Sequence, residues 1–212
     1  MKTDIPLLLL GIVSVCGCAT NEPSVNYDIV PGEGIAHIAA LGMHAQDVAK
    51  NTGNGVVATI TGESGLWATV PSLGIFWHDE DTRDGITRLT FILDASAYDN
   101  SCPLSRLHRF RGTLSGVVSL SKPGSLTRDK VVAIFGEPAH AFDISAPTTN
   151  DVIRVLATHD ATVRKCESAS LLTATDIEVL SYPCQGIWFY LRNNIVLTLE
   201  VTKRVEPGAL RR

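Results

Sequence analysis

The predicted fold is decided by the stretch Ile187-Trp188-Phe189-Tyr190-Leu191-Arg192-Asn193-Asn194-Ile195-Val196-Leu197-Thr198-Leu199-Glu200-Val201-Thr202. Its first half alternates Ile187, Phe189 and Leu191 with Trp188 and Tyr190, and its second half alternates Ile195, Leu197, Leu199 and Val201 with Thr198, Glu200 and Thr202. Successive side chains of a strand point to opposite faces of a sheet, so this alternation is typical of strands. Arg192-Asn193-Asn194 supplies turn residues between them. The stretch therefore predicts a β-hairpin with one buried face.

A related pattern occurs earlier in the chain. Ile75 and Trp77 alternate with Phe76 and His78, and after an acidic turn Leu89, Phe91 and Leu93 alternate with Arg88 and Thr90. The two patterns begin with similar turn sequences, Pro71-Ser72-Leu73-Gly74-Ile75-Phe76-Trp77 and Pro183-Cys184-Gln185-Gly186-Ile187-Trp188-Phe189, which lie 112 residues apart. Further strands are predicted over 56–60 and 66–70.

A short helix is predicted before each set of strands. One covers 41–48 and stops at Gly53, and the other follows Thr127, a suitable N-cap, and stops at Gly136. The second carries an apolar i, i+3, i+4 stripe formed by Val131, Ile134 and Phe135. Matching helix positions lie 83 residues apart. The sequence therefore predicts an α+β fold of two tandem copies of a short helix packed on an antiparallel β-meander.

The difference between the two spacings, 112 and 83 residues, indicates a 29-residue insertion in the second copy. The predicted parts are a signal peptide (1–17), a lipidated tether (18–28), a first α+β repeat (29–96), a linker (97–111), a second α+β repeat (112–205) with the insertion near 139–176, and a tail (206–212).

The amino terminus predicts export. An apolar stretch of eleven residues from Ile5 to Val15 is too short to cross a bilayer, which needs about 20 residues, but has the length of a signal-peptide core. It ends at Val15-Cys16-Gly17-Cys18, which resembles the lipobox of bacterial lipoproteins. That resemblance implies lipid attachment at Cys18. The alternative is an ordinary secretory signal that is cleaved nearby.

Several short motifs resemble small α+β modules of the bacterial cell envelope. Pro31-Gly32-Glu33-Gly34 with Leu41-Gly42-Met43, and Thr127 to Val131 before Phe135-Gly136-Glu137-Pro138, are similar to the opening of SmpA/OmlA outer-membrane assembly lipoproteins and of tandem-repeat β-lactamase inhibitor proteins. The resemblance covers about half of the mature chain. It implies a non-catalytic module that binds other proteins.

Composition argues against nucleic acid as a partner. The 212-residue chain has a formal net charge of -4, and its arginines are scattered apart from the terminal pair Arg211-Arg212.

The mature chain would contain three cysteines, Cys102, Cys166 and Cys184. One disulfide and one free thiol are possible, and all three pairings stay open.

The sequence matches no catalytic or metal-binding motif, so it predicts no catalytic residue, metal ligand or cofactor. The six histidines lack zinc-site spacing, and no Gly-x-Ser-x-Gly elbow occurs. The acidic run from Asp79 to Gly85 has Arg83 and Asp84 where a calcium loop would need an oxygen ligand and a glycine, so it predicts a solvated turn. A Cys184 nucleophile with a histidine supplied by the fold stays open as an alternative.

Strand parity selects the candidate partner-binding residues. If the apolar set faces the helices, then Phe76, His78, Trp188 and Tyr190 face the other side of the sheet. Exposed aromatic residues often carry binding energy. The alternative, which the sequence slightly favours, is that these four side chains are buried, either between the two halves or under the insertion.

The resulting prediction is a lipid-anchored, non-catalytic cell-envelope protein that binds or helps assemble other envelope proteins. Its expected place is the outer membrane, facing the periplasm, with the membrane itself as a second partner. The alternatives are an exported enzyme with a Cys/His site and a structural lipoprotein that tethers a membrane to another envelope layer.

Overall fold

The computed structural model describes residues 27–53, 58–62, 65–78, 85–98, 106–143 and 177–206. Thirteen strands in this part of the chain form two sheets, accompanied by two short helices and two 3-10 turns. The strands of the large sheet are β4 (Ala58–Gly62), β5 (Gly65–Val70), β6 (Ile75–His78), β7 (Arg88–Ile92), β10 (His140–Asp143), β11 (Glu178–Tyr182), β12 (Ile187–Arg192) and β13 (Ile195–Thr202). The remaining elements are β1 (Asp28–Val30), β2 (Gly34–Ile35), β3 (Ala39–Ala40), β8 (Thr113–Leu114), β9 (Val118–Ser119), α1 (Ala45–Asn51), α2 (Arg128–Phe135), η1 (Pro71–Leu73) and η2 (Ala95–Ala97).

The large sheet is a continuous antiparallel sheet with the order β10-β11-β12-β13-β7-β6-β5-β4. Its centre is the pair β13–β7, in which Leu199 lies opposite Phe91. The Thr198 hydroxyl adds a bond across this pair by donating to the carbonyl of Phe91 at 2.7 Å. Strands from residues 58–92 and strands from residues 140–202 are thereby joined into one layer.

The small sheet has the order β3-β2-β1-β8-β9. Its pair β1–β8 is parallel, with Asp28 opposite Thr113 and Ile29 opposite Leu114. The Asp28 carboxylate strengthens this pair because it accepts bonds from the Thr113 hydroxyl and from the amide of Gly116, both at 2.7 Å.

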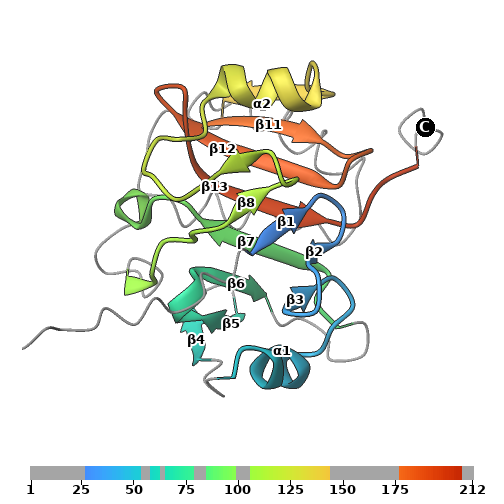
Figure 1. Ribbon diagram of the computed structural model, residues 1–212, viewed down its shortest axis with the longest axis vertical. Helices are drawn as coiled ribbons and strands as arrows, with labels where there is room; N and C mark the ends of the chain where they lie inside the picture. The colour runs from blue at the N-terminus through green and yellow to red at the C-terminus, as the bar shows by residue number, and fades with distance from the viewer. Residues whose placement is uncertain are drawn as a thin grey trace, which may run out of the picture.

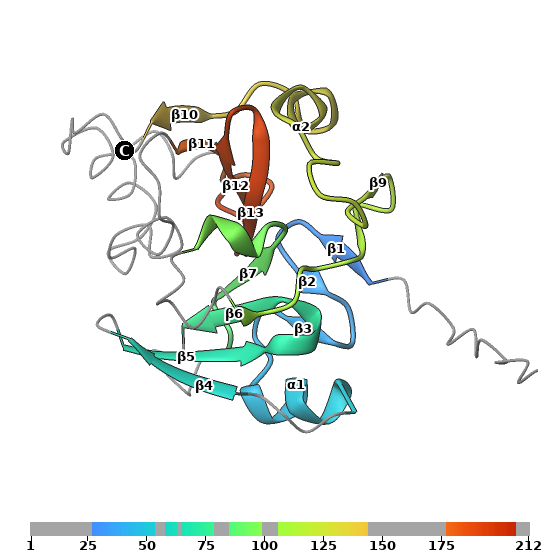
Figure 2. The same ribbon diagram turned by 90° about the vertical axis from the view of Figure 1, so that its left-hand side faces the viewer.

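The main core lies between the two sheets. Figure 1 shows the small sheet in front of the middle of the large sheet, with α2 at the top and α1 at the bottom, and Figure 2 shows the same layers from the side. Core side chains come from both sheets and both helices, and include Ile29, Val48, Leu114, Val131 and Phe189, each fully buried. Edge-to-face packing of Phe110 on Phe91, 5.1 Å between ring centroids, extends this core to the segment before β8.

The fold class predicted from the sequence is wrong. The described chain is mostly β-sheet, and its two helices have only seven and eight residues. The β13–β7 pairing merges the strands of the two predicted copies into one sheet, and the small sheet takes strands from both. A fold of two copies of a helix packed on a separate meander therefore does not describe this protein. The domain boundaries stay a prediction.

The individual elements agree better with the sequence. The second helix and both hairpins occur at the predicted positions. The first helix covers Ala45–Asn51 and so begins four residues later than predicted. Neither helix has a side-chain cap bond at its N-cap residue, His44 or Thr127. The predicted signal peptide, Cys18, residues 79–84 of the acidic turn and residues 144–176 of the insertion lie outside the described residues. No helix in the described ranges is long and apolar enough to cross a bilayer.

Three side chains hold α2 to the large sheet. Arg128 forms an ion pair with Glu178 at 2.9 Å, which raises the pKa of Arg128. The Tyr182 hydroxyl donates to the carbonyl of Gly136 at 3.0 Å, and the Gln185 amide donates to that of Phe135 at 3.2 Å. The carbonyls at the end of α2 are thus satisfied by the β11–β12 turn region. Burial, followed by the negative charge of Glu137, raises the pKa of Tyr182 to about 12.

A bulge in β13 changes the predicted alternation. Tyr190 lies opposite Thr198 while the next residue, Leu191, lies opposite Val196, so β13 has one extra residue at Leu197. Because a bulge shifts parity, Val196 belongs to the main core and Leu197 does not. The prediction that only one face of this hairpin is buried is also wrong, since both faces are covered.

Candidate functional site on the outer face of the large sheet

A row of polar and aromatic side chains crosses the outer face of the large sheet, the face turned away from the small sheet. We call it the outer row. In register order from β11 to β5 it consists of Ser181, Trp188, Glu200, Thr90, Phe76 and Thr69. All six are buried, but none belongs to the core cluster between the sheets. Tyr190 and Thr198, which lie opposite each other, form a second row beside it.

Glu200 is the charged residue at the centre of the outer row. Only 3% of it is exposed. Its Oε1 lies 3.1 Å from Nε of Arg88, and the Tyr190 hydroxyl lies 3.5 Å from Oε2. A buried carboxylate is costly unless it is paired and hydrogen-bonded, and these partners provide both kinds of compensation. The aromatic neighbours exclude water and so strengthen the attraction between Arg88 and Glu200.

Two other groups contribute to this face. Phe76 packs edge-to-face on Tyr98, with ring centroids 6.4 Å apart. Ser181 is fully buried, and its hydroxyl has no hydrogen-bond partner in the part of the chain that the structure describes. A hydroxyl in this position costs folding free energy.

Internal contacts hold the charged side chain at the centre of the outer row. The carboxylate of Glu200 is occupied by Arg88 and Tyr190. No group of three or more His, Cys, Asp and Glu side chains that could hold a metal ion occurs within the described ranges. Cys184 is an exposed free thiol in the turn between β11 and β12, three residues after Ser181 of the outer row.

The structure brings three of the predicted binding residues to one face. Phe76, Trp188 and Tyr190 lie opposite the core side of their strands, as strand parity predicts, but they are 0%, 5% and 0% exposed. A partner could reach them only if this face were uncovered. His78 is in β6 opposite Trp67, and its side chain lies outside the described part. The partner-binding role of these four residues stays a prediction.

Glu200 and Arg88 were not predicted from the sequence as members of this site. A signal was available, because Glu200 is the single charged residue in a strand of otherwise apolar and threonine residues. Hairpin register alone places it opposite Trp188. Its buried ion pair with Arg88 depends on the β13–β7 pairing, which joins strands more than 100 residues apart in sequence.

Comparison with known proteins gives no family, curated protein or solved structure that matches this chain.

Proposed function

We propose that this protein is a lipid-anchored, non-catalytic protein of the cell envelope that binds or helps assemble other envelope proteins. The observation that carries the proposal is Val15-Cys16-Gly17-Cys18 at the end of an eleven-residue apolar core. Cys18 receives the lipid, and the part of the chain that the structure describes begins nine positions later at Tyr27. The expected location is the outer membrane, facing the periplasm.

The internal bonds of the buried Glu200 carboxylate support a binding role for the protein. The buried carboxylate of Glu200 is committed to internal bonds with Arg88 and Tyr190, which is typical of a supporting framework. The resemblance of the short motifs to envelope assembly lipoproteins and β-lactamase inhibitor proteins points in the same direction.

Acylation is tested by intact-mass analysis and fractionation of cells that express the full chain. We expect the wild-type protein to carry acyl chains and to fractionate with membranes, and Cys18→Ser to accumulate as the uncleaved precursor. Cys16→Ser is the matched control, because it leaves the acylated residue in place. An unacylated mature wild-type chain would contradict the anchor.

Binding is tested by cross-linking in intact cells followed by identification of the linked proteins. We expect the wild-type protein, but not the mislocalised Cys18→Ser precursor, to be linked reproducibly to a specific envelope protein. Rapid labelling of Cys184 alone by an electrophilic probe, together with the absence of any linked protein, would favour the enzyme alternative.

A further inference from the structure

We propose that the segment from Arg106 to Lys122 forms a basic face that lies on the anionic phospholipids of the membrane in which the lipid anchor is embedded. This inference rests on the proposed function, since it needs acylated Cys18. The segment carries four cationic side chains, Arg106, Arg109, Arg111 and Lys122, and no Asp or Glu, although the whole chain has a net charge of -4. Three of the four are exposed.

Hydrogen bonds fold this basic segment into a compact unit. The Arg109 guanidinium donates to the carbonyl of Ser121 at 3.1 Å and also to that of Leu120, so the start of the segment contacts its end. The amide of Leu120 donates to Gly112 at 2.8 Å. Arg111 lies close enough for its charge to lower the pKa of Arg109, after the larger effect of burial and against the opposing effect of Asp94. Arg109 and Arg111 therefore lie close together, and Arg109 lies beside the residues that precede Lys122.

The basic segment lies where the lipid tether enters the fold. The amide of Thr113 donates to the carbonyl of Tyr27 at 2.8 Å, and the amide of Gly116 donates to the Asp28 carboxylate at 2.7 Å. Tyr27 lies nine positions after Cys18, and this stretch spans at most about 30 Å when fully extended. The tether therefore holds these cations at a high effective concentration near the membrane, where even a weak contact is populated.

The basic segment also carries an exposed apolar residue that is suited to contact with a membrane. Val117, in the turn between β8 and β9, is 74% exposed, whereas Ile195, the other exposed large apolar residue in the described ranges, is 38% exposed. A membrane surface accommodates both features of this turn region, because apolar tips enter the headgroup layer and cations attract anionic lipids. An acidic protein would satisfy the charges without explaining the link to the tether.

The inference is tested with the acylated full-length protein in phosphatidylcholine vesicles, with or without phosphatidylglycerol. Val117→Trp introduces a fluorescent residue at the turn, and brominated lipids quench it only if it enters the membrane. Ile195→Trp is the matched control. We expect phosphatidylglycerol to raise the quenching of Val117→Trp by more than about twofold, with little change for Ile195→Trp. Emission from the native tryptophans is subtracted with the wild-type protein.

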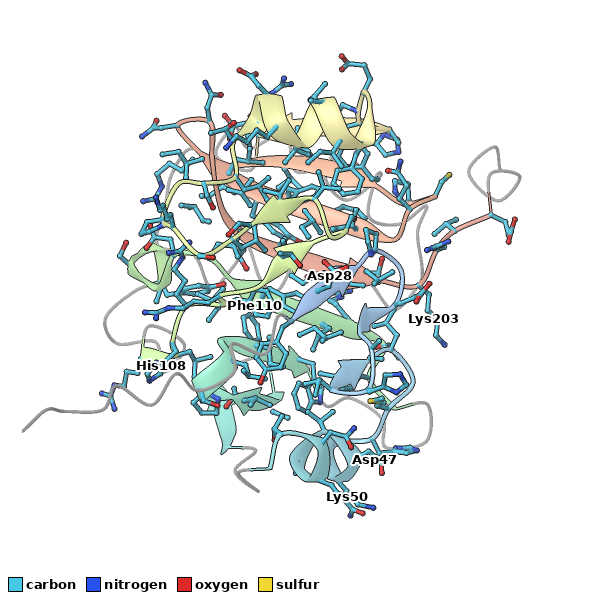
Figure 3. All side chains as sticks on the ribbon, in the orientation of Figure 1. Asp28, Asp47, Lys50, His108, Phe110 and Lys203 are labelled. Carbon is cyan, nitrogen blue, oxygen red and sulfur yellow. The ribbon has the colours of Figure 1, made fainter. Side chains whose placement is uncertain are left out.

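Charge dependence is tested in the same assay. Arg111→Glu combined with Lys122→Glu should remove the effect of phosphatidylglycerol. Lys50→Glu combined with Lys203→Glu should preserve it, because Figure 3 shows these two lysines away from the segment that carries His108 and Phe110. Added salt should weaken the quenching of Val117→Trp without any charge substitution, since salt screens exposed charges.

The possible outcomes separate this inference from the proposed function. A purified chain without acyl groups overturns both. An acylated chain that stays on the vesicles while Val117→Trp is quenched no more than Ile195→Trp overturns the basic face alone. Equal quenching of Val117→Trp with and without phosphatidylglycerol also overturns the basic face alone. So does a protein partner whose cross-link is lost on charge reversal, if lipids do not quench Val117→Trp.

Discussion

Glu200 and Glu178 form ion pairs of the same chemistry in different surroundings. The Glu200 side chain is 4% exposed and that of its partner Arg88 is 22% exposed, whereas the side chains of Glu178 and Arg128 are 32% and 35% exposed. Removing one partner of a buried pair leaves an uncompensated charge, while a surface pair contributes little. Burial should therefore decide how much each pair matters.

We expect Glu200→Gln to lower the free energy of unfolding by about 2–4 kcal/mol, because it removes the ion pair with Arg88 at a position that is almost fully buried. Glu178→Gln, the matched control, should cost less than about 1 kcal/mol. Urea unfolding of both variants measures the difference. Equal losses would show that the outer row is solvated and does not bury this charge.

Phe76 distinguishes a binding surface from a core. Because Phe76 is fully buried, we expect Phe76→Ala to cost about 3–5 kcal/mol of stability. Val117→Ala, at an exposed position, should change stability by no more than about 0.5 kcal/mol. A Phe76→Ala protein that keeps its thermal midpoint but loses its cross-linked partner would instead support the aromatic surface predicted from the sequence.

Residue positions were predictable in one respect only. Strand parity correctly assigned Ile75, Trp77 and Phe189 to the core side and Trp188 to the other side. Burial of Phe76, Trp188 and Tyr190 agrees with the alternative that the sequence slightly favoured. Parity itself did not supply it, because alternation within a strand carries no information about what covers each face.

The turns that precede β6 and β12 use glycine in the same way. Gly74 and Gly186 both have positive φ, 64° and 70°. The carbonyl of Gly74 accepts a hydrogen bond from the amide of Ile92, and that of Gly186 accepts one from the amide of Thr202. A side chain at Gly74 would collide with the carbonyl of His108. The shared proline–glycine turns noted in the sequence thus have a common structural role.

We expect Gly74→Ala to destabilise the protein by about 3 kcal/mol or more, because it adds a backbone collision to the strain of a positive φ. Gly42→Ala should cost only about 1 kcal/mol, since Gly42 also has a positive φ, 85°, but no atom lies within 4 Å of the added carbon. Thermal unfolding compares the two variants. Similar losses would mean that the segment around His108 moves aside easily.

Tyr182 should make the attachment of α2 sensitive to alkaline pH. Its folded-state pKa of about 12 lies above the ordinary value of 10, so the folded protein holds the phenol proton more tightly than the unfolded chain. This contribution is complete below pH 10 and declines as the pH rises to 12. At pH 8, Tyr182→Phe should be about 1 kcal/mol less stable than the wild-type protein, because the substitution removes the hydrogen bond to the carbonyl of Gly136. This difference in stability should shrink above pH 10. A constant difference across this range would contradict the assignment.

Elements were predictable where they are long and regular. The hairpin of β12 and β13 has strands of six and eight residues, which is enough alternation to recognise. The small sheet was missed because β2, β3, β8 and β9 have two residues each, too few to show any periodicity. The bulge at Leu197 leaves the local sequence pattern intact, so only the pairing with Tyr190 and Leu191 shows it.

The whole molecule should unfold as one unit because β13 and β7 join the two halves of the large sheet. Trp77 in β6 and Trp188 in β12 report on opposite halves. Variants that keep one of the two, with the other tryptophans replaced by phenylalanine, should share one urea midpoint and agree with circular dichroism. Two separate midpoints would contradict unfolding as one unit and show that the two halves of the large sheet unfold independently.

The pairing of β13 with β7 explains why the overall architecture was not predictable. Sequence patterns showed two sets of strands with matching turns, and each set was expected to close on its own helix. Edge pairing between the two sets is decided by which strands meet in three dimensions, which no local pattern of residues encodes.

The parallel pair β1–β8 also has a mechanical consequence. Any pull transmitted through the residues before Tyr27 acts first on β1, which is bonded to the second half of the chain through Tyr27, Ile29 and the Asp28 carboxylate. A pull along the strand axis loads these bonds together in shear instead of opening them one after another. The first strand is therefore fastened to resist tension at the end where an anchored protein would experience it.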